Sequence, residues 1–118
     1  MSWTVYCAVL PSGWSLANAT STYNFGGQIM ANYQKSGGAT FHLEEGQICG
    51  ASGTGCTVKG SHIGSVKFGD RNGEMYDLGS GIIHVWVGVG GTIVYHVETV
   101  NVSAMQASDL VNAMHRLS

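Results

Sequence analysis

CTVKGSHIGSVKFGDRNGEMYDLGSGIIHVWVGVGGTIVYHVETV, residues 56–100, is the stretch that decides the fold class. It holds four runs rich in β-branched and aromatic residues, which favour strands. The runs are separated by Asp70–Gly73, Gly79–Gly81 and Gly90–Gly91. Turn sequences of this kind connect neighbouring antiparallel strands in hairpins. The stretch therefore predicts an antiparallel meander.

The segment after the meander has the pattern of a helix. Ser103 and Gln106 form an S-x-x-Q capping box, in which each side chain can bond the other's backbone N–H. Apolar residues then recur at helical spacing and give one face that can pack on the sheet: Ala104, Ala107, Leu110, Val111 and Met114. A C-terminal helix over Ser103–Arg116 is predicted.

The first half of the chain gives weaker signals. The composition of residues 1–10 favours a strand, yet their Trp, Tyr, Cys and Leu also recur at helical spacing. Residues 12–26 are rich in Ser, Asn, Thr and Gly and predict an irregular connection. Residues 27–33 and 39–42 predict short strands, and residues 42–51 (HLEEGQICGA) predict a short helix.

Length and charge narrow the class of protein. With 118 residues, 44% of them apolar, the chain predicts one domain over residues 1–118 with a single core. Only five basic residues are present and they are scattered, so binding of nucleic acid or of a membrane surface through a basic patch is not expected. No run approaches the roughly 20 apolar residues of a membrane span. Cys7, Cys49 and Cys56, an odd number without a secretory signal, predict reduced cysteines in the cytosol.

The residues that carry catalysis or bind metals show no recognised arrangement. None of the five histidines and three cysteines has zinc-finger spacing. The pattern favours His84 and His96 as packing or surface residues, beside Trp86 and Tyr95. Glu44 and Glu45 are adjacent, so they diverge and do not form a pair for acid–base chemistry. We therefore predict no enzyme, no metal and no cofactor, although a Cys–His dyad stays open.

Several segments together resemble the profilin family. The chain opens with Met1-Ser2-Trp3 and Tyr6, similar to the M-S-W-x-x-Y start of many profilins, and SHIGSVKF (61–68) resembles the family's G-x-x-L-G-G-T-K-Y strand. HLEEGQIC, TIVYHV and the ending Ala113–Arg116 follow in the family's order. The resemblance implies an α+β fold: a central antiparallel sheet of about six or seven strands, with N- and C-terminal helices packed on one face. It also makes residues 1–10 a helix.

The resemblance further implies a cytoplasmic, cytoskeleton-associated monomer that binds monomeric actin and regulates filament assembly. The residues it assigns to the actin surface are Lys67, Arg71, Met105, Gln106 and Asp109. Those it assigns to a proline-rich peptide are Trp3, Tyr6, Phe41 and His115. The family's basic run is absent from residues 73–81, so phosphoinositide binding is expected to be weak or absent.

Two other functions remain open at this point. One is a small hydrolase or toxin-like enzyme that uses a histidine with a cysteine or a carboxylate. The other is a regulatory scaffold of similar fold that does not bind actin.

Overall fold

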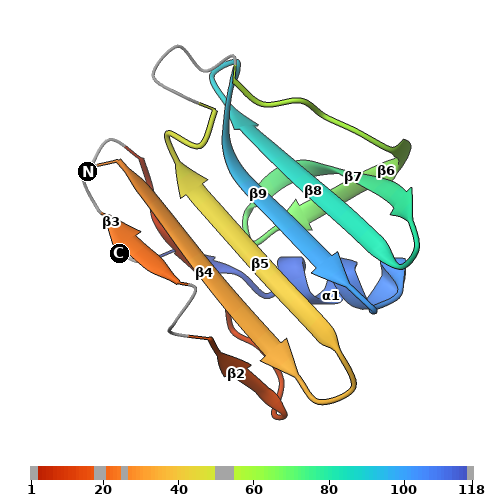
Figure 1. The fold of residues 1–118 in the computed structure, drawn as a ribbon. Helices are drawn as coiled ribbons and strands as arrows, with labels where there is room; N and C mark the ends of the chain where they lie inside the picture. The colour runs from red at the N-terminus through yellow and green to blue at the C-terminus, as the bar shows by residue number, and fades with distance from the viewer. Residues whose placement is uncertain (1–2, 18–20, 25–26, 50–54, 117–118) are drawn as a thin grey trace.

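A computed structural model of the chain describes residues 3–17, 21–24, 27–49 and 55–116. The fold is a broad antiparallel sheet with one helix, α1 (Ala104–Asn112), on one of its faces (Figure 1). The strands of this sheet are β2 (Trp14–Leu16), β3 (Thr22–Asn24), β4 (Gln28–Lys35), β5 (Ala39–Gly46), β6 (Ser61–Phe68), β7 (Arg71–Gly79), β8 (Ile82–Val89) and β9 (Thr92–Val100).

The strand order joins the two halves of the chain at one central pair. The sheet runs β2-β4-β5-β9-β8-β7-β6, and β3 also pairs with β4. Strands β6 to β9 pair antiparallel in sequence order, which confirms the predicted meander. Strand β9 pairs with β5, a neighbour more than 45 residues earlier in the chain, and its register places Glu44 opposite His96.

The core lies between the sheet and α1. Leu110 and Val111 of the helix are buried against apolar side chains of the strands, among them Phe41, Phe68 and Val97. The capping box is confirmed: Gln106 N–H donates to Ser103 Oγ at 3.1 Å, and Ser103 N–H donates to Gln106 Oε1 at 2.9 Å.

The predicted profilin-like α+β fold is wrong, because α1 is the single helix of the described residues and no helix forms near the N-terminus. Instead β1 (Tyr6–Cys7) pairs with β10 (His115–Arg116) in a separate small sheet. Tyr6 is buried, and its ring lies 5.2 Å from those of Phe68 and Tyr95. An isolated helical stripe does not outweigh such long-range packing, because short helices are marginal alone. The predicted C-terminal helix also ends early, since residues 115–116 pair with β1.

Three local expectations also fail. Residues 42–46 continue β5 instead of starting a helix, and Leu43 and Glu45 alternate into the core. Within residues 12–26, which were expected to be irregular, the structure has strands β2 and β3. Cys49 and Cys56 form a disulfide, so the expectation of reduced cysteines is wrong for this pair.

The described residues contain no candidate for a membrane-spanning helix. No helix there is both long and apolar enough to cross a bilayer.

Candidate functional site

Seven ionisable side chains gather on the sheet face opposite α1. In β5 to β9 side chains alternate between the core and the opposite face, as strand geometry requires, with one irregularity in β6 between His62 and Gly64. This arrangement, the histidine–glutamate face, collects four of the five histidines and three of the four glutamates. Its members are His42, Glu44, His62, Glu74, His84, His96 and Glu98.

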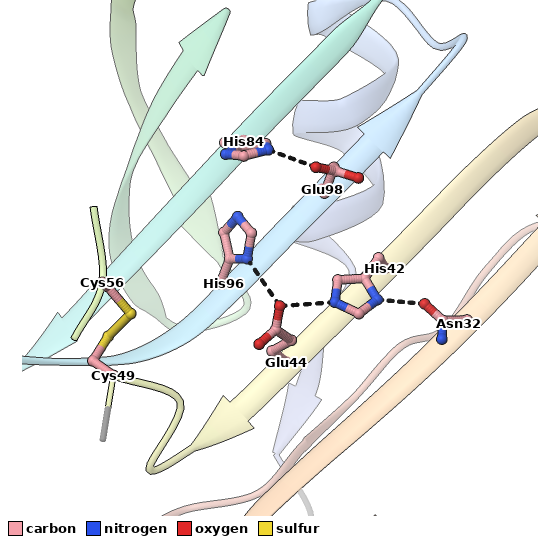
Figure 2. Close-up of polar contacts among 8 residues, drawn as sticks. All are labelled: Asn32, His42, Glu44, Cys49, Cys56, His84, His96 and Glu98. Carbon is pink, nitrogen blue, oxygen red and sulfur yellow. Dashed lines mark hydrogen bonds and ion pairs between the residues drawn. A yellow bond between two sulfur atoms is a disulfide. The ribbon is translucent and has the colours of Figure 1, made fainter. Parts of the chain in front are cut away.

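Glu44 lies between two imidazoles at the centre of this face (Figure 2). Its Oε1 is 2.8 Å from Nε2 of His42 on the same strand and 3.4 Å from Nδ1 of His96 on β9. The other ring nitrogen of His42, Nδ1, contacts Oδ1 of Asn32 on β4. Three adjacent strands therefore supply one chain of polar contacts.

The surroundings of Glu44 and His96 lower the pKa of both groups. Hydrogen bonds to His42 and then to His96 lower the pKa of the Glu44 carboxyl to about 2, so it is ionised at neutral pH. Burial lowers the pKa of His96 below its ordinary value, although its contact with Glu44 opposes this. An ionised carboxylate beside a neutral imidazole is therefore the resting state of the Glu44–His96 pair.

A second pair lies one strand further along. Nε2 of His84 on β8 is 2.7 Å from Oε2 of Glu98 on β9. The His84 and His96 rings meet edge to face with centroids 4.6 Å apart, and Trp86 stacks on His96 at 3.9 Å. His84 is 9% exposed and His96 only 7%. One nitrogen on each ring, Nδ1 of His84 and Nε2 of His96, is buried without a hydrogen-bond partner.

A pocket of about 470 Å³ opens on the same face above these pairs. Both Glu44 and Glu98 line it, and none of its lining residues is a lysine or an arginine. Its other lining residues are Ala17, Asn32, Tyr33, Gln34, Thr40, His42 and His96. The acidic side chains of the pocket are those of Glu44 and Glu98.

Metal binding has no support from this geometry. Among the residues that the structure describes, no group of three or more His, Cys, Asp or Glu side chains is arranged to hold a metal ion. Hydrogen bonds between histidines and glutamates account for the cluster instead.

The residues predicted to contact actin lie on two sides of the molecule. Lys67 points from the same sheet face as Ser65 and donates to Asn72 Oδ1 at 2.7 Å, whereas Met105, Gln106 and Asp109 belong to α1 on the other face. Arg71 lies beside the Tyr6 and Tyr95 rings. The role in binding actin stays a prediction.

The residues predicted to bind proline-rich peptides do not form an exposed ledge. Phe41 is fully buried and Tyr6 nearly so. Trp3 is half-buried, and its indole nitrogen lies 3.4 Å from Oε1 of Glu45. Only His115 is exposed, on β10. Stacking of a proline ring on Phe41 would require the core to open.

The sequence carries a signal for this site in the spacing of its histidines and glutamates. The triplet H-x-E occurs twice, as His42-Leu43-Glu44 and His96-Val97-Glu98. In a strand, residues two apart share one face. The helix predicted over residues 42–51 would place His42 and Glu44 on different faces, so it hid this spacing. The pairing of β5 with β9 cannot be derived from either triplet alone.

Comparisons with known proteins do not place the chain in a family. The scan of protein-family models, the search of curated proteins and the search of solved structures each returned no match.

Proposed function

We propose that the chain is a binding protein that holds a cationic group of its ligand, an ammonium or a guanidinium, in the pocket between Glu44 and Glu98. The observation that carries the proposal is the pocket itself, lined by two glutamates and by no lysine or arginine. Glu44 keeps its negative charge because its neighbours lower its pKa to about 2. Hydrogen bonds in which one partner is charged are about twice as strong as neutral ones.

Binding is favoured over acid–base catalysis because the ring nitrogens of His42 and His96 are engaged or buried. A catalytic acid or base needs a nitrogen or oxygen within reach of the substrate. Both ring nitrogens of His42 are already engaged, and the free nitrogen of His96 is buried. The carboxylate oxygens remain acceptors for a bound cation.

A cysteine-dependent hydrolase is disfavoured for a separate reason. Cys49 and Cys56 are joined to each other, which leaves Cys7 as the free thiol. Cys7 faces His115 across the β1–β10 pair, so the two could form a dyad. However, burial, together with the charge of Glu45, raises the pKa of the Cys7 thiol, and a thiol is a poor nucleophile until it loses its proton.

The proposal is tested by titrating the protein with methylguanidinium at pH 7.5 and following the imidazole signals of His42 and His96 by NMR. Two carboxylates that flank the cation in one pocket should give a dissociation constant of about 1 mM, which corresponds to about −4 kcal/mol. Glu44→Gln should weaken binding. Asp109→Asn on α1 removes the same charge from the opposite face and should leave binding unchanged.

Unchanged imidazole signals up to about 100 mM methylguanidinium would contradict the proposal. So would an equal loss of affinity in the Glu44 and Asp109 variants, because it would show that only the total charge matters.

A further inference from the structure

Negative charge on the histidine–glutamate face extends beyond the pocket. Glu74 on β7 is two strands from Glu98, with β8 between them. Its carboxylate oxygens contact His62 Nε2 at 2.6 Å and Ser65 Oγ at 3.1 Å, and its side chain is about half exposed. Neighbouring strands lie about 4.8 Å apart, and Glu74 is in register with His96, two residues from Glu98 along β9, so roughly 12 Å separate Glu74 from Glu98. A ligand with one charge cannot reach both carboxylates.

The net charge of this face depends on its histidines. Glu44, Glu74 and Glu98 carry three negative charges, and Lys67 at the end of β6 carries one positive charge. With all four imidazoles neutral these charges sum to −2, and each imidazole that gains a proton raises the sum by one. The one further titratable side chain on these strands and this face is the phenol of Tyr76, whose ring contacts that of His62. Imidazoles gain protons between about pH 8 and pH 5.

Two buried ring nitrogens on this face have no hydrogen-bond partner. A carboxylate only accepts hydrogen bonds, so the nitrogens of His84 and His96 that face glutamates must donate. In the neutral rings, Nδ1 of His84 and Nε2 of His96 then carry lone pairs with no donor. Nε2 of His96 is directed along the face towards His84 (Figure 2). An unsatisfied buried acceptor is costly, and an N–H donor that reached it after a side-chain movement would satisfy it.

We infer that the ligand is a lysine- or arginine-rich polypeptide segment that lies across the strands from the Glu44–Glu98 pocket to Glu74, and that protonation of the histidines releases it. This inference rests on the proposed function. An extended chain suits the spacing, because side chains four residues apart in an extended peptide point the same way and are about 14 Å apart, as are Glu44 and Glu74 across three in-register strand pairings.

Release follows from the contacts already present. Each glutamate of the face has an imidazole within 2.8 Å: His42 for Glu44, His84 for Glu98 and His62 for Glu74. Once protonated, each imidazole becomes the ion-pair partner of its glutamate and competes with the cations of the peptide. A protonated His84 would also carry an N–H group at Nδ1, where the peptide needs an acceptor. The fold need not open for release.

The test uses a fluorescein-labelled hexalysine peptide and measures its binding by anisotropy at low salt. We expect affinity at pH 7.5 to exceed that at pH 5.5 at least about tenfold, with unchanged circular dichroism. Glu74→Gln should weaken hexalysine binding about fivefold and leave methylguanidinium binding unchanged. Asp109→Asn serves again as the charge-matched control. The double variant His42→Gln with His84→Gln should reduce the pH effect.

The outcomes separate the two proposals. If methylguanidinium binds but Glu74→Gln leaves hexalysine affinity unchanged, the extended ligand is wrong and the proposed function stands. Equal hexalysine affinity at both pH values, or an undiminished pH effect in the double variant, overturns release by the histidines. If neither probe binds, the proposed function itself fails.

Discussion

Glu45 should make the protein less stable as the pH rises towards 7, and Glu45→Gln should remove that dependence. The Glu45 side chain is buried in the core, where its Oε1 accepts a hydrogen bond from Tyr6 N–H at 2.8 Å. Burial raises the pKa of the Glu45 carboxyl to about 7, and the hydrogen bonds from Tyr6 and Trp3 oppose this only in part.

The sign and size follow from the difference between the folded and unfolded pKa. The folded state holds this proton more tightly, so its contribution to stability is complete below the unfolded pKa of about 4.5. That contribution is lost as the pH rises to about 7. Each pKa unit corresponds to about 1.4 kcal/mol, so the change between these limits is about 3 kcal/mol.

Urea denaturation followed by circular dichroism, without reductant and at pH 4.5 to 8.5, measures this directly. The stability of Glu45→Gln relative to the native protein should improve by about 3 kcal/mol across that range. Glu44→Gln is the matched control on the adjacent residue and the opposite face. The pKa of Glu44 is lowered to about 2, so ionised Glu44 stabilises the fold above about pH 4.5, and this variant should lose stability at neutral pH. Parallel pH profiles for the native protein and Glu45→Gln would refute the reasoning.

Three further predictions concern stability. Cys49→Ser should lower the free energy of unfolding by about 2 kcal/mol, because its disulfide to Cys56 closes a short loop; an equal effect of reductant on the native protein checks it. Gly46→Ala should destabilise by about 3 kcal/mol or more, since φ is +103° and a Cβ would lie 2.5 Å from a backbone oxygen. Gly90→Ala, with open space around its Cβ position, should lower the free energy of unfolding by only about 1 kcal/mol. Equal losses for Gly46→Ala and Gly90→Ala in urea denaturation would contradict this account. Phe41→Ala should lower stability by about 3–5 kcal/mol, and a near-zero loss would mean that Phe41 is not a core residue.

The parts of the fold that the sequence could predict are those with local causes. The turn predicted at Asp70–Gly73 lies at Gly69–Asp70, since β7 already begins at Arg71, and the turn at Gly90–Gly91 connects β8 and β9 as predicted. The Ser103–Gln106 capping box acts within one helical turn. Pairing between β5 and β9 has no such local cause, because it depends on which apolar faces meet in the folded chain. The helix expected near the N-terminus failed for the same reason, since Tyr6 is held by contacts to Glu45 and Phe68.

The candidate site was hidden by the same limitation. Each His-x-Glu triplet shows which side chains share one face of a strand, but not which strand lies beside it. Glu44 receives its second imidazole only because β9 pairs with β5 in the register that sets His96 opposite Glu44. The resemblance to profilins predicted a peptide site that included Tyr6 and Phe41, and both are core residues.

Strand β5 connects the core to the candidate site through two adjacent glutamates. Because successive side chains of a strand point to opposite faces, a one-residue slip of β5 would exchange the positions of Glu44 and Glu45. The contacts of Glu45 and Gly46 oppose this slip: Tyr6 N–H binds the Glu45 carboxylate, and Trp3 packs where Gly46 lacks a side chain. The register that buries Glu45 therefore also places ionised Glu44 between His42 and His96. A variant that loosens residues 3–6 should then weaken cation binding at Glu44, although none of residues 3–6 lines the pocket.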